Sequence, residues 1–278
     1  MAIARRAFIA ASSAWVGCAL TGLASADAGA PRKIGAPMTK SELDARIRDL
    51  FGGHLTCVKT PESAEGPFYS ESSPERRQIA EGHPGVRLRL GISVAGLGGF
   101  GPDKRCPALR GAIVDIWHTD ASGLYSNVGD DLQPLDTIGQ TFCRGHQIAD
   151  QNGFVEFDTI VPGWELAPAP VPAGALARAT HIHVKVFKGH TVATTQLYLP
   201  DKFLDDLYAN VKPYADHRSL TAPGLTRGYA RVRNTDDGIF VMDRSTPMTV
   251  RQEGGVVRAT AVIGLAALTS EGTSPLWR

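Results

Sequence analysis

The sequence predicts an all-β fold, an antiparallel β-sandwich with a short N-terminal helix and long loops. Short segments of the chain alternate between apolar and polar residues, which is typical of strands that bury one face. The 278 residues include 30 glycines and 18 prolines, a content that favours many turns over long helices. With 43% hydrophobic residues and neither an internal repeat nor an interdomain linker, the chain is expected to form one large domain.

Residues 1–26 are expected to be a signal peptide that is absent from the mature protein. The segment has Arg5 and Arg6, then a run of apolar and small residues, then an A-S-A cleavage site at residues 24–26. The paired arginines favour twin-arginine export, with ordinary secretion as the alternative. Because the apolar run is short and rich in alanine and glycine, no stable membrane anchor is expected. The protein is therefore predicted to be exported, either to the periplasm or out of the cell.

Residues 27–56 are expected to form a leader that contains one short helix at residues 39–53. Thr39 or Ser41 can cap its first turn, and Gly52-Gly53 can end it. The apolar residues between these ends recur at helical spacing, namely Leu43, Ile47, Leu50 and Phe51. The β-sandwich domain is then predicted to span residues 57–278.

Eight segments of this domain read as strands, separated by turn residues such as A-D-Q-N-G at residues 149–153. The expected strands are residues 86–96, 110–118, 141–149, 153–161, 180–187, 191–199, 238–243 and 256–265. One further short helix is expected at residues 201–211. Short strands at this spacing, with turns between them, predict the sandwich.

The charge pattern excludes one class of partner. The formal net charge is +1, and no run of five like charges occurs. The chain thus lacks the electrostatic footprint of a nucleic-acid-binding protein, and no nucleic-acid partner is expected. An oligomer is compatible with the sequence.

Three cysteines lie beyond the expected signal peptide: Cys57, Cys106 and Cys143. An exported chain can form disulfides, and three thiols permit one bridge and leave one over. Cys57 and Cys106 both sit beside polar loop sequence that contains proline, so we expect these two to pair. Cys143 lies in an expected strand and is predicted to be a buried small hydrophobe.

Two histidines share one face of the strand predicted at residues 180–187. His181 and His183 are two residues apart, so their Cα atoms lie about 6.5–7 Å apart on the same side. Imidazoles from such positions can converge on one metal ion at about 2.0–2.1 Å. The spacing alone leaves two alternatives open, a metal chelate or two histidines on a half-buried strand.

Seven segments of the chain form a set whose order is specific. They are TPESAEGPFY, EGHPGVRLRL, LRGAIVDIWHTDASGLYSN, TFCRGHQIADQNGFVEFDTIVPGW, RATHIHVKVF, TTQLYLPD and NTDDGIF. Together they span roughly residues 57–240 and resemble the intradiol ring-cleavage dioxygenases, in particular the exported single-chain members of that family. The resemblance implies a β-sandwich that holds one non-haem Fe(III). It also implies that the substrates are a small aromatic diol of the catechol type and O2, and that the product is a muconate-type diacid.

The resemblance also implies roles for individual residues. Tyr125, His181 and His183 match three of the four protein ligands of the iron in the family. Arg178 matches an arginine that lies over the reacting ring, where it stabilises negative charge that builds up during the reaction. Gln196 matches a glutamine near the substrate.

The fourth ligand of the family does not match. A tyrosine normally stands three residues after the proline of a P-G-x-Y motif, whereas this chain has Pro162-Gly163-Trp164-Glu165. Glu165 can replace the tyrosine as an oxygen ligand and then act as the general base that accepts a substrate proton. Alternatively, the Pro/Ala-rich residues 166–177 re-route the loop and leave the position to water. In a third alternative the chain is a non-catalytic β-sandwich binding protein with an altered metal site.

Overall fold

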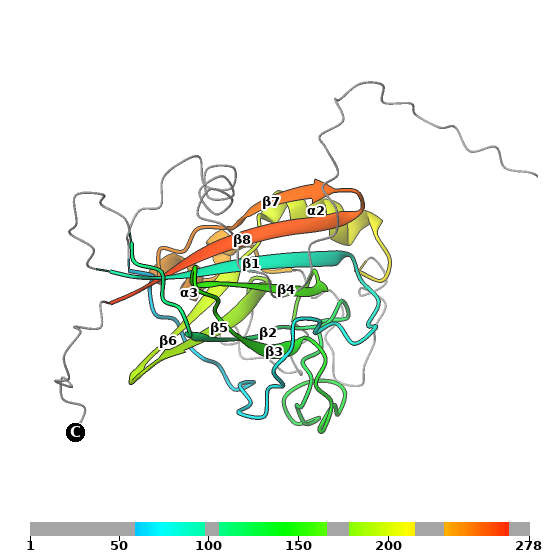
Figure 1. Ribbon diagram of the computed structural model, residues 1–278. Coiled ribbons are helices and arrows are strands. Elements are labelled where there is room, and N and C mark those ends of the chain that lie inside the picture. The colour runs from blue at the N-terminus through cyan, green and yellow to red at the C-terminus, as the bar shows by residue number, and fades with distance from the viewer. Residues whose placement is uncertain (1–58, 98–105, 166–177, 215–230, 267–278) are drawn as a thin grey trace, which may run out of the picture. The chain divides into compact units, whose positions relative to one another are not determined.

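Eight strands form two four-stranded sheets in the computed structural model, which describes residues 59–97, 106–165, 178–214 and 231–266 (Figure 1). The strands are β1 (Arg87–Gly96), β2 (Ile113–Trp117), β3 (Arg144–Ile148), β4 (Phe154–Ile160), β5 (His181–Lys188), β6 (Thr191–Tyr198), β7 (Thr249–Glu253) and β8 (Val256–Leu265). The helices are α2 (Asp201–Asn210), the 3-10 helix η2 (Asn234–Asp236) and α3 (Gly238–Met242). The expected signal peptide, leader and N-terminal helix lie outside the described residues.

The strand order is β4-β1-β8-β7 in one sheet and β3-β2-β5-β6 in the other. The all-β sandwich is confirmed, and every neighbouring pair is antiparallel except β1 with β8, which is parallel. The expectation of a purely antiparallel fold is wrong at this pair. Parallel neighbours need a long connection, and the whole second sheet lies between β1 and β8 along the chain.

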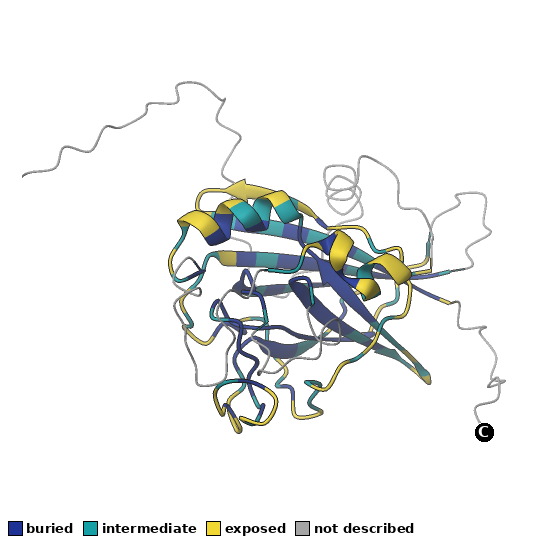
Figure 2. Ribbon diagram, turned by 180° about the vertical axis from the view of Figure 1, so that it is seen from behind, coloured by how far each residue is buried: buried dark blue, intermediate teal, exposed yellow. Residues whose placement is uncertain are grey.

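The facing sides of the two sheets form the core. Alternate residues of each strand point inward, as Leu88, Leu90 and Ile92 of β1 illustrate with at most 1% exposure. From the other sheet, Ile182 and Val184 of β5 are fully buried in the same cluster. Figure 2 shows in dark blue that buried residues run along the strands of both sheets. The core therefore uses only one face of β5 and leaves the other for different side chains.

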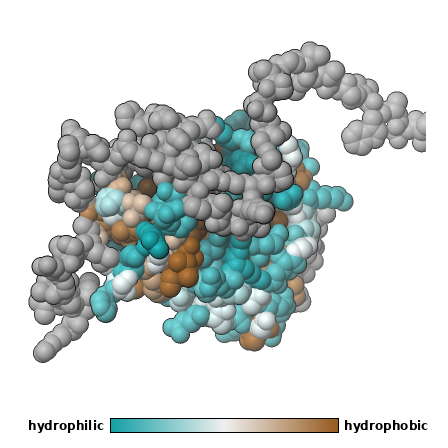
Figure 3. Space-filling model, in the orientation of Figure 1, coloured by the Kyte–Doolittle hydropathy of each residue, from teal (hydrophilic) through white to brown (hydrophobic). Residues whose placement is uncertain are grey.

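The face of the β3-β2-β5-β6 sheet turned away from the core, here called the outer face, carries three rows of paired residues. The rows are Arg144–Trp117–His183–Gln196, His146–Asp115–Lys185–Thr194 and Ile148–Ile113–Phe187–Val192. The last row contains three exposed apolar residues, Ile113, Ile148 and Val192. The described surface turned to the viewer in Figure 3 is mostly hydrophilic, with one apolar patch. Both expected histidines, His181 and His183, thus lie at one end of the outer face.

Residues 238–243 were expected to form a strand, and this prediction is wrong. The segment forms α3, because the Asp237 side chain accepts hydrogen bonds from the backbone N–H groups of Ile239 and Phe240 and so caps a helix. The edge strand of the sheet is instead β7. The helix expected at residues 201–211 is confirmed as α2.

Both cysteines within the described residues were predicted in part: Cys106 forms a disulfide and Cys143 is buried, but Cys143 lies in the turn before β3 and not in a strand. Cys106 is disulfide-bonded, and Cys57, its expected partner, lies outside the described residues. Cys143 is a free thiol with no exposed surface. Among the described helices, none has the length and apolar character that a membrane crossing requires.

We expect Val184→Ala to lower the free energy of unfolding by about 2 kcal/mol, since Val184 is fully buried between the sheets. The matched control is Val192→Ala in the neighbouring strand β6, where the side chain is 47% exposed. We expect this second change to cost less than about 0.5 kcal/mol. Urea unfolding measures both values, and equal losses would contradict the assignment of Val184 to the core.

Candidate metal centre

The outward-facing histidines of β5 meet at their Nε2 atoms, which are 2.9 Å apart. Both side chains are at most 3% exposed. The Nδ1 atom of His181 lies 2.7 Å from the carbonyl oxygen of Ala179. A carbonyl can only accept a hydrogen bond, so Nδ1 carries the proton and Nε2 presents its lone pair. The strand and its own backbone therefore aim this imidazole at His183.

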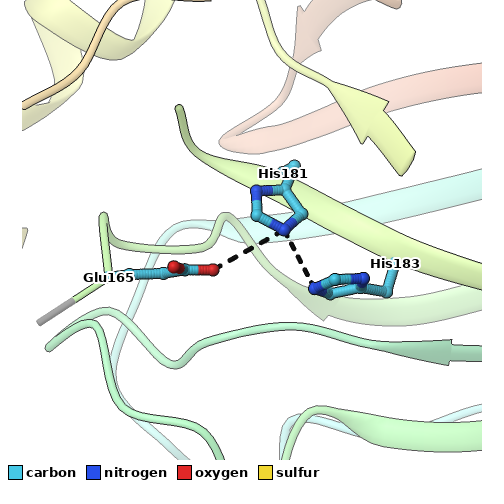
Figure 4. A group of neighbouring side chains, drawn as sticks. All are labelled: Glu165, His181 and His183. Atoms are coloured by element: carbon cyan, nitrogen blue, oxygen red, sulfur yellow. Dashed lines mark hydrogen bonds and ion pairs between the residues drawn. The ribbon is translucent and has the colours of Figure 1, made fainter. Parts of the chain in front are cut away.

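Glu165 reaches the histidines from the segment that follows β4. Its Oε1 lies 3.6 Å from the Nε2 atom of His181, and Figure 4 shows the three side chains converging. Gly163 makes this approach feasible, because a Cβ atom there would lie 2.5 Å from the carbonyl oxygen of Ala121. The backbone N–H of Gly163 also donates to the carbonyl of Asp120. The segment that carries Glu165 is thus held against the turn that precedes Tyr125.

Tyr125 completes the group from that turn. Its phenol donates a 2.5 Å hydrogen bond to Oε1 of Glu165, and its ring stacks on Phe68 with centroids 4.4 Å apart. Gln133 fixes the backbone of Tyr125, accepting from its N–H and donating to its carbonyl oxygen, both at 2.9 Å. Tyr125 is only 2% exposed. Four side chains from three separate segments therefore meet at one point.

The distances and charges of this group fit one metal ion. The ligand atoms of Glu165, His181 and His183 all lie within 4.8 Å of one another. Two nitrogens about 2.05 Å from one ion and at right angles to each other lie about 2.9 Å apart, which is the separation of the two Nε2 atoms. Two nitrogens and two oxygens form a donor set that suits iron.

Electrostatics around the site keep the ligand atoms ready for a cation. Burial lowers the pKa of His181 and lowers that of His183 well below its usual value, so both imidazoles are neutral, the form in which a ring nitrogen can bind a metal. Burial, and then the neighbouring carboxylate of Glu165, raise the pKa of Tyr125. The phenol therefore keeps its proton in this arrangement, and a bound cation supplies the charge needed to remove it.

The structure places two more predicted residues beside the cluster. Gln196 pairs with His183 across β5 and β6. The Nη2 atom of Arg178 donates to Oε1 of Gln196 and to the Tyr198 hydroxyl, and its Nε donates to Asp237 at 2.9 Å. All six site residues predicted from the sequence thus lie in one region, and their roles remain predictions.

Sequence reasoning missed two neighbours of this site. The Trp117 ring is parallel to that of His183, with an angle of 3° between them and centroids 4.7 Å apart. Its position, the last residue of β2 and in register with His183, follows from strand alternation once the pairing is known. The other neighbour is Asp237, which bonds to Arg178 and which no local signal in the sequence links to it.

Comparison with known proteins settles the family. The family model described as Dioxygenase matches residues 64–222, more than half of the chain. The chain belongs to the intradiol ring-cleavage dioxygenases. Chlorocatechol 1,2-dioxygenase from Pseudomonas sp. (strain P51) is 29% identical over 197 residues, 65% of this chain and 69% of that protein. The chlorocatechol 1,2-dioxygenase from Rhodococcus opacus is 28% identical over 52% of this chain and 59% of that protein.

Solved structures agree on the fold. The intradiol ring-cleavage dioxygenase from Tetranychus urticae is 23% identical with a TM-score of 0.57, covering 76% of this chain and 94% of that one. The dioxygenase domain of a dioxygenase and carbohydrate-binding protein fusion from Streptomyces sp. SirexAA-E is 28% identical with a TM-score of 0.50. That match covers 76% of this chain and all of the other.

A buried acid in the middle row of the outer face predicts a pH effect on stability. Asp115 is 5% exposed and accepts a 2.7 Å hydrogen bond from the Ser73 hydroxyl. Burial raises the pKa of Asp115 to about 6, above its value in the unfolded chain. Its contribution to stability is therefore present at low pH and is lost as the pH rises through about 6.

The quantity to compare is the free energy of unfolding of the native chain minus that of Asp115→Asn. We expect this difference to be about 2 kcal/mol smaller at pH 7 than at pH 4. Denaturant unfolding at each pH measures this difference. Asp130→Asn serves as the control because Asp130 is exposed. A difference between Asp115→Asn and the native chain that stays constant over this pH range would contradict the prediction.

Proposed function

We propose that this protein is an Fe(III) dioxygenase that opens a catechol-type ring between its two hydroxyl groups and forms a muconate-type diacid. The observation that carries the proposal is the convergence of Tyr125, Glu165, His181 and His183 in a member of this family. The curated relatives named above are chlorocatechol 1,2-dioxygenases, which supports an aromatic diol as the substrate. Both atoms of O2 enter the product, so no other oxidant is needed.

We assign the four protein ligands to Tyr125, Glu165, His181 and His183. When bound, Fe(III) supplies Lewis acidity that lowers the pKa of the diol hydroxyls and makes the ring reactive toward O2. Glu165 occupies the position of the family's second tyrosine, and like a tyrosinate it brings one negative charge and a hard oxygen donor. The net charge of the ligand set is therefore the same as with two tyrosinates.

Glu165 is also the proton acceptor in this proposal. Its Oε1 already accepts a hydrogen bond from the phenol of Tyr125, which shows that a hydroxyl group can approach this oxygen. A substrate hydroxyl that approaches this carboxylate beside Tyr125 can pass its proton to it. Arg178, partly buried and bonded to Gln196, places positive charge where negative charge builds on the ring. Gln196 donates to the carbonyl of Ala64 and so fixes the wall of the site on that side.

The activity is tested on the purified chain loaded with Fe(III). We expect about one iron per chain, a visible absorption band from the Tyr125 tyrosinate, and a shift of that band when catechol is added without O2. Under ¹⁸O2, mass spectrometry should find both labelled atoms in the diacid. Catechol binding without any labelled product would support instead a non-catalytic binding protein.

We expect Glu165→Gln to lower kcat by about 10²–10³, because the amide cannot accept the substrate proton. Glu165→Tyr should raise the visible absorption of the iron-loaded protein, because it supplies a second tyrosinate. Steady-state kinetics and absorption spectra measure these effects. Glu253→Gln, an exposed position on β7, is the control. Iron affinity and turnover of Glu165→Gln equal to those of the native chain would remove Glu165 from the site.

A further inference from the structure

Asp237 is a buried carboxylate that no step of the proposed reaction uses. Its side chain has no exposed surface. Oδ2 accepts from Nε of Arg178 at 2.9 Å and from the backbone N–H of Ala179 at 2.8 Å. Oδ1 accepts from the backbone N–H groups of Ile239 and Phe240 at the start of α3. Asp237 therefore joins α3 to the segment that enters β5.

The first of its two links to the site is the Arg178 guanidinium. Nε of Arg178 bonds to Asp237, while Nη2 of the same group bonds to Gln196 and Tyr198. These three partners bind two different nitrogens of one planar group, so together they fix its position and its plane. The ring of Phe240, in α3, packs edge-on against Tyr198 with centroids 4.8 Å apart, and so supports one of the partners of Arg178.

The second link is the Ala179 backbone. Its N–H donates to Asp237, and its carbonyl accepts from Nδ1 of His181. An isolated β-bridge to Val232 holds the same residue from the other side. A substitution of Asp237 can therefore alter the position of His181 through Ala179, and it can alter the position of Arg178 directly.

We propose that Asp237 is a positioning residue, which sets the Arg178 guanidinium over the substrate position and orients His181 toward the metal. This inference rests on the proposed function for Arg178 and on the metal site for His181. Asp237 has no part in the chemistry itself. Without the carboxylate of Asp237, Arg178 is a partly buried cation that has lost its ion pair at 2.9 Å.

Two variants separate the positioning role from the capping of α3. Asp237→Asn keeps an oxygen acceptor at one of the two oxygen positions, but its amide N–H groups face donors at the other. Asp237→Ser keeps a good helix cap and removes the charged partner of Arg178. The adjacent Asp236→Asn is the matched control, because Asp236 is exposed.

The first measurement is affinity for Fe(III) in competition with a chelator, which needs no turnover. We expect Asp237→Asn and Asp237→Ser to weaken iron binding about 10- to 100-fold, as loss of a group that orients a ligand does. Arg178→Ala and Asp236→Asn should bind iron within about threefold of the native chain. Native affinity in both Asp237 variants, with melting temperatures like that of the control, would overturn the link to His181.

The second measurement is a double-mutant cycle in kcat with catechol. We expect Asp237→Asn and Arg178→Ala each to lower kcat about 10- to 100-fold with a smaller change in KM, since misplacement by 1 Å has such effects. If Asp237 acts through Arg178, the double variant should lose little more than Arg178→Ala alone. If the losses of kcat in the two single variants multiply in the double variant, the link to Arg178 is overturned. Failure of the native, iron-loaded chain to turn over would instead refute the proposed function, and the iron affinities would still decide the role of Asp237.

Discussion

The alternation of side chains along β5 is the constraint on which the site depends. Ile182, Val184 and Val186 face the core, so His181 and His183 must face outward, close enough for their Nε2 atoms to lie 2.9 Å apart. A slip of one residue would exchange the two sets and destroy the core and the metal site together. Pairing with β2 and β6 on both sides prevents that slip. The same strand register therefore determines both the stability of the sandwich and the geometry of the site.

The positions of the two proposed oxygen ligands depend on a different feature, a close contact between two loops. Gly163 lies against Ala121, and the hydroxyl of Thr119 donates to the carbonyl of Gly163. Because these loops carry Glu165 and Tyr125, their contact sets the distance between the two oxygens. From the segment that this contact holds, the carboxylate of Glu165 reaches both Tyr125 and His181.

Local pattern in the sequence was sufficient for most of the fold and for placing both histidines on one face of a strand, whereas their role as ligands needed the resemblance to the family. Strands with one buried face alternate visibly, and β1, β5 and β8 lie where the alternation predicted them. The short helix α3 could not be predicted in this way, because its apolar residues resemble a strand and its capping residue looks like an ordinary turn. The role of Asp237 was hidden for a related reason: its partner Arg178 is 59 residues away, and only the fold brings them together. The parallel pairing of β1 with β8 is equally non-local.

That parallel pair has a consequence for how the chain reaches its native state. β8 runs between β1 and β7, so the sheet β4-β1-β8-β7 is interrupted until residues 256–265 are available. Contacts between residues so distant in sequence are slow to form, because a long loop must close first. During synthesis, one edge of β1 therefore stays unpaired until β8 has been made, and this edge can pair with other chains. A chaperone that shields this edge would be expected to raise the yield of folded protein more than one that acts on the later, local hairpin of β5 and β6.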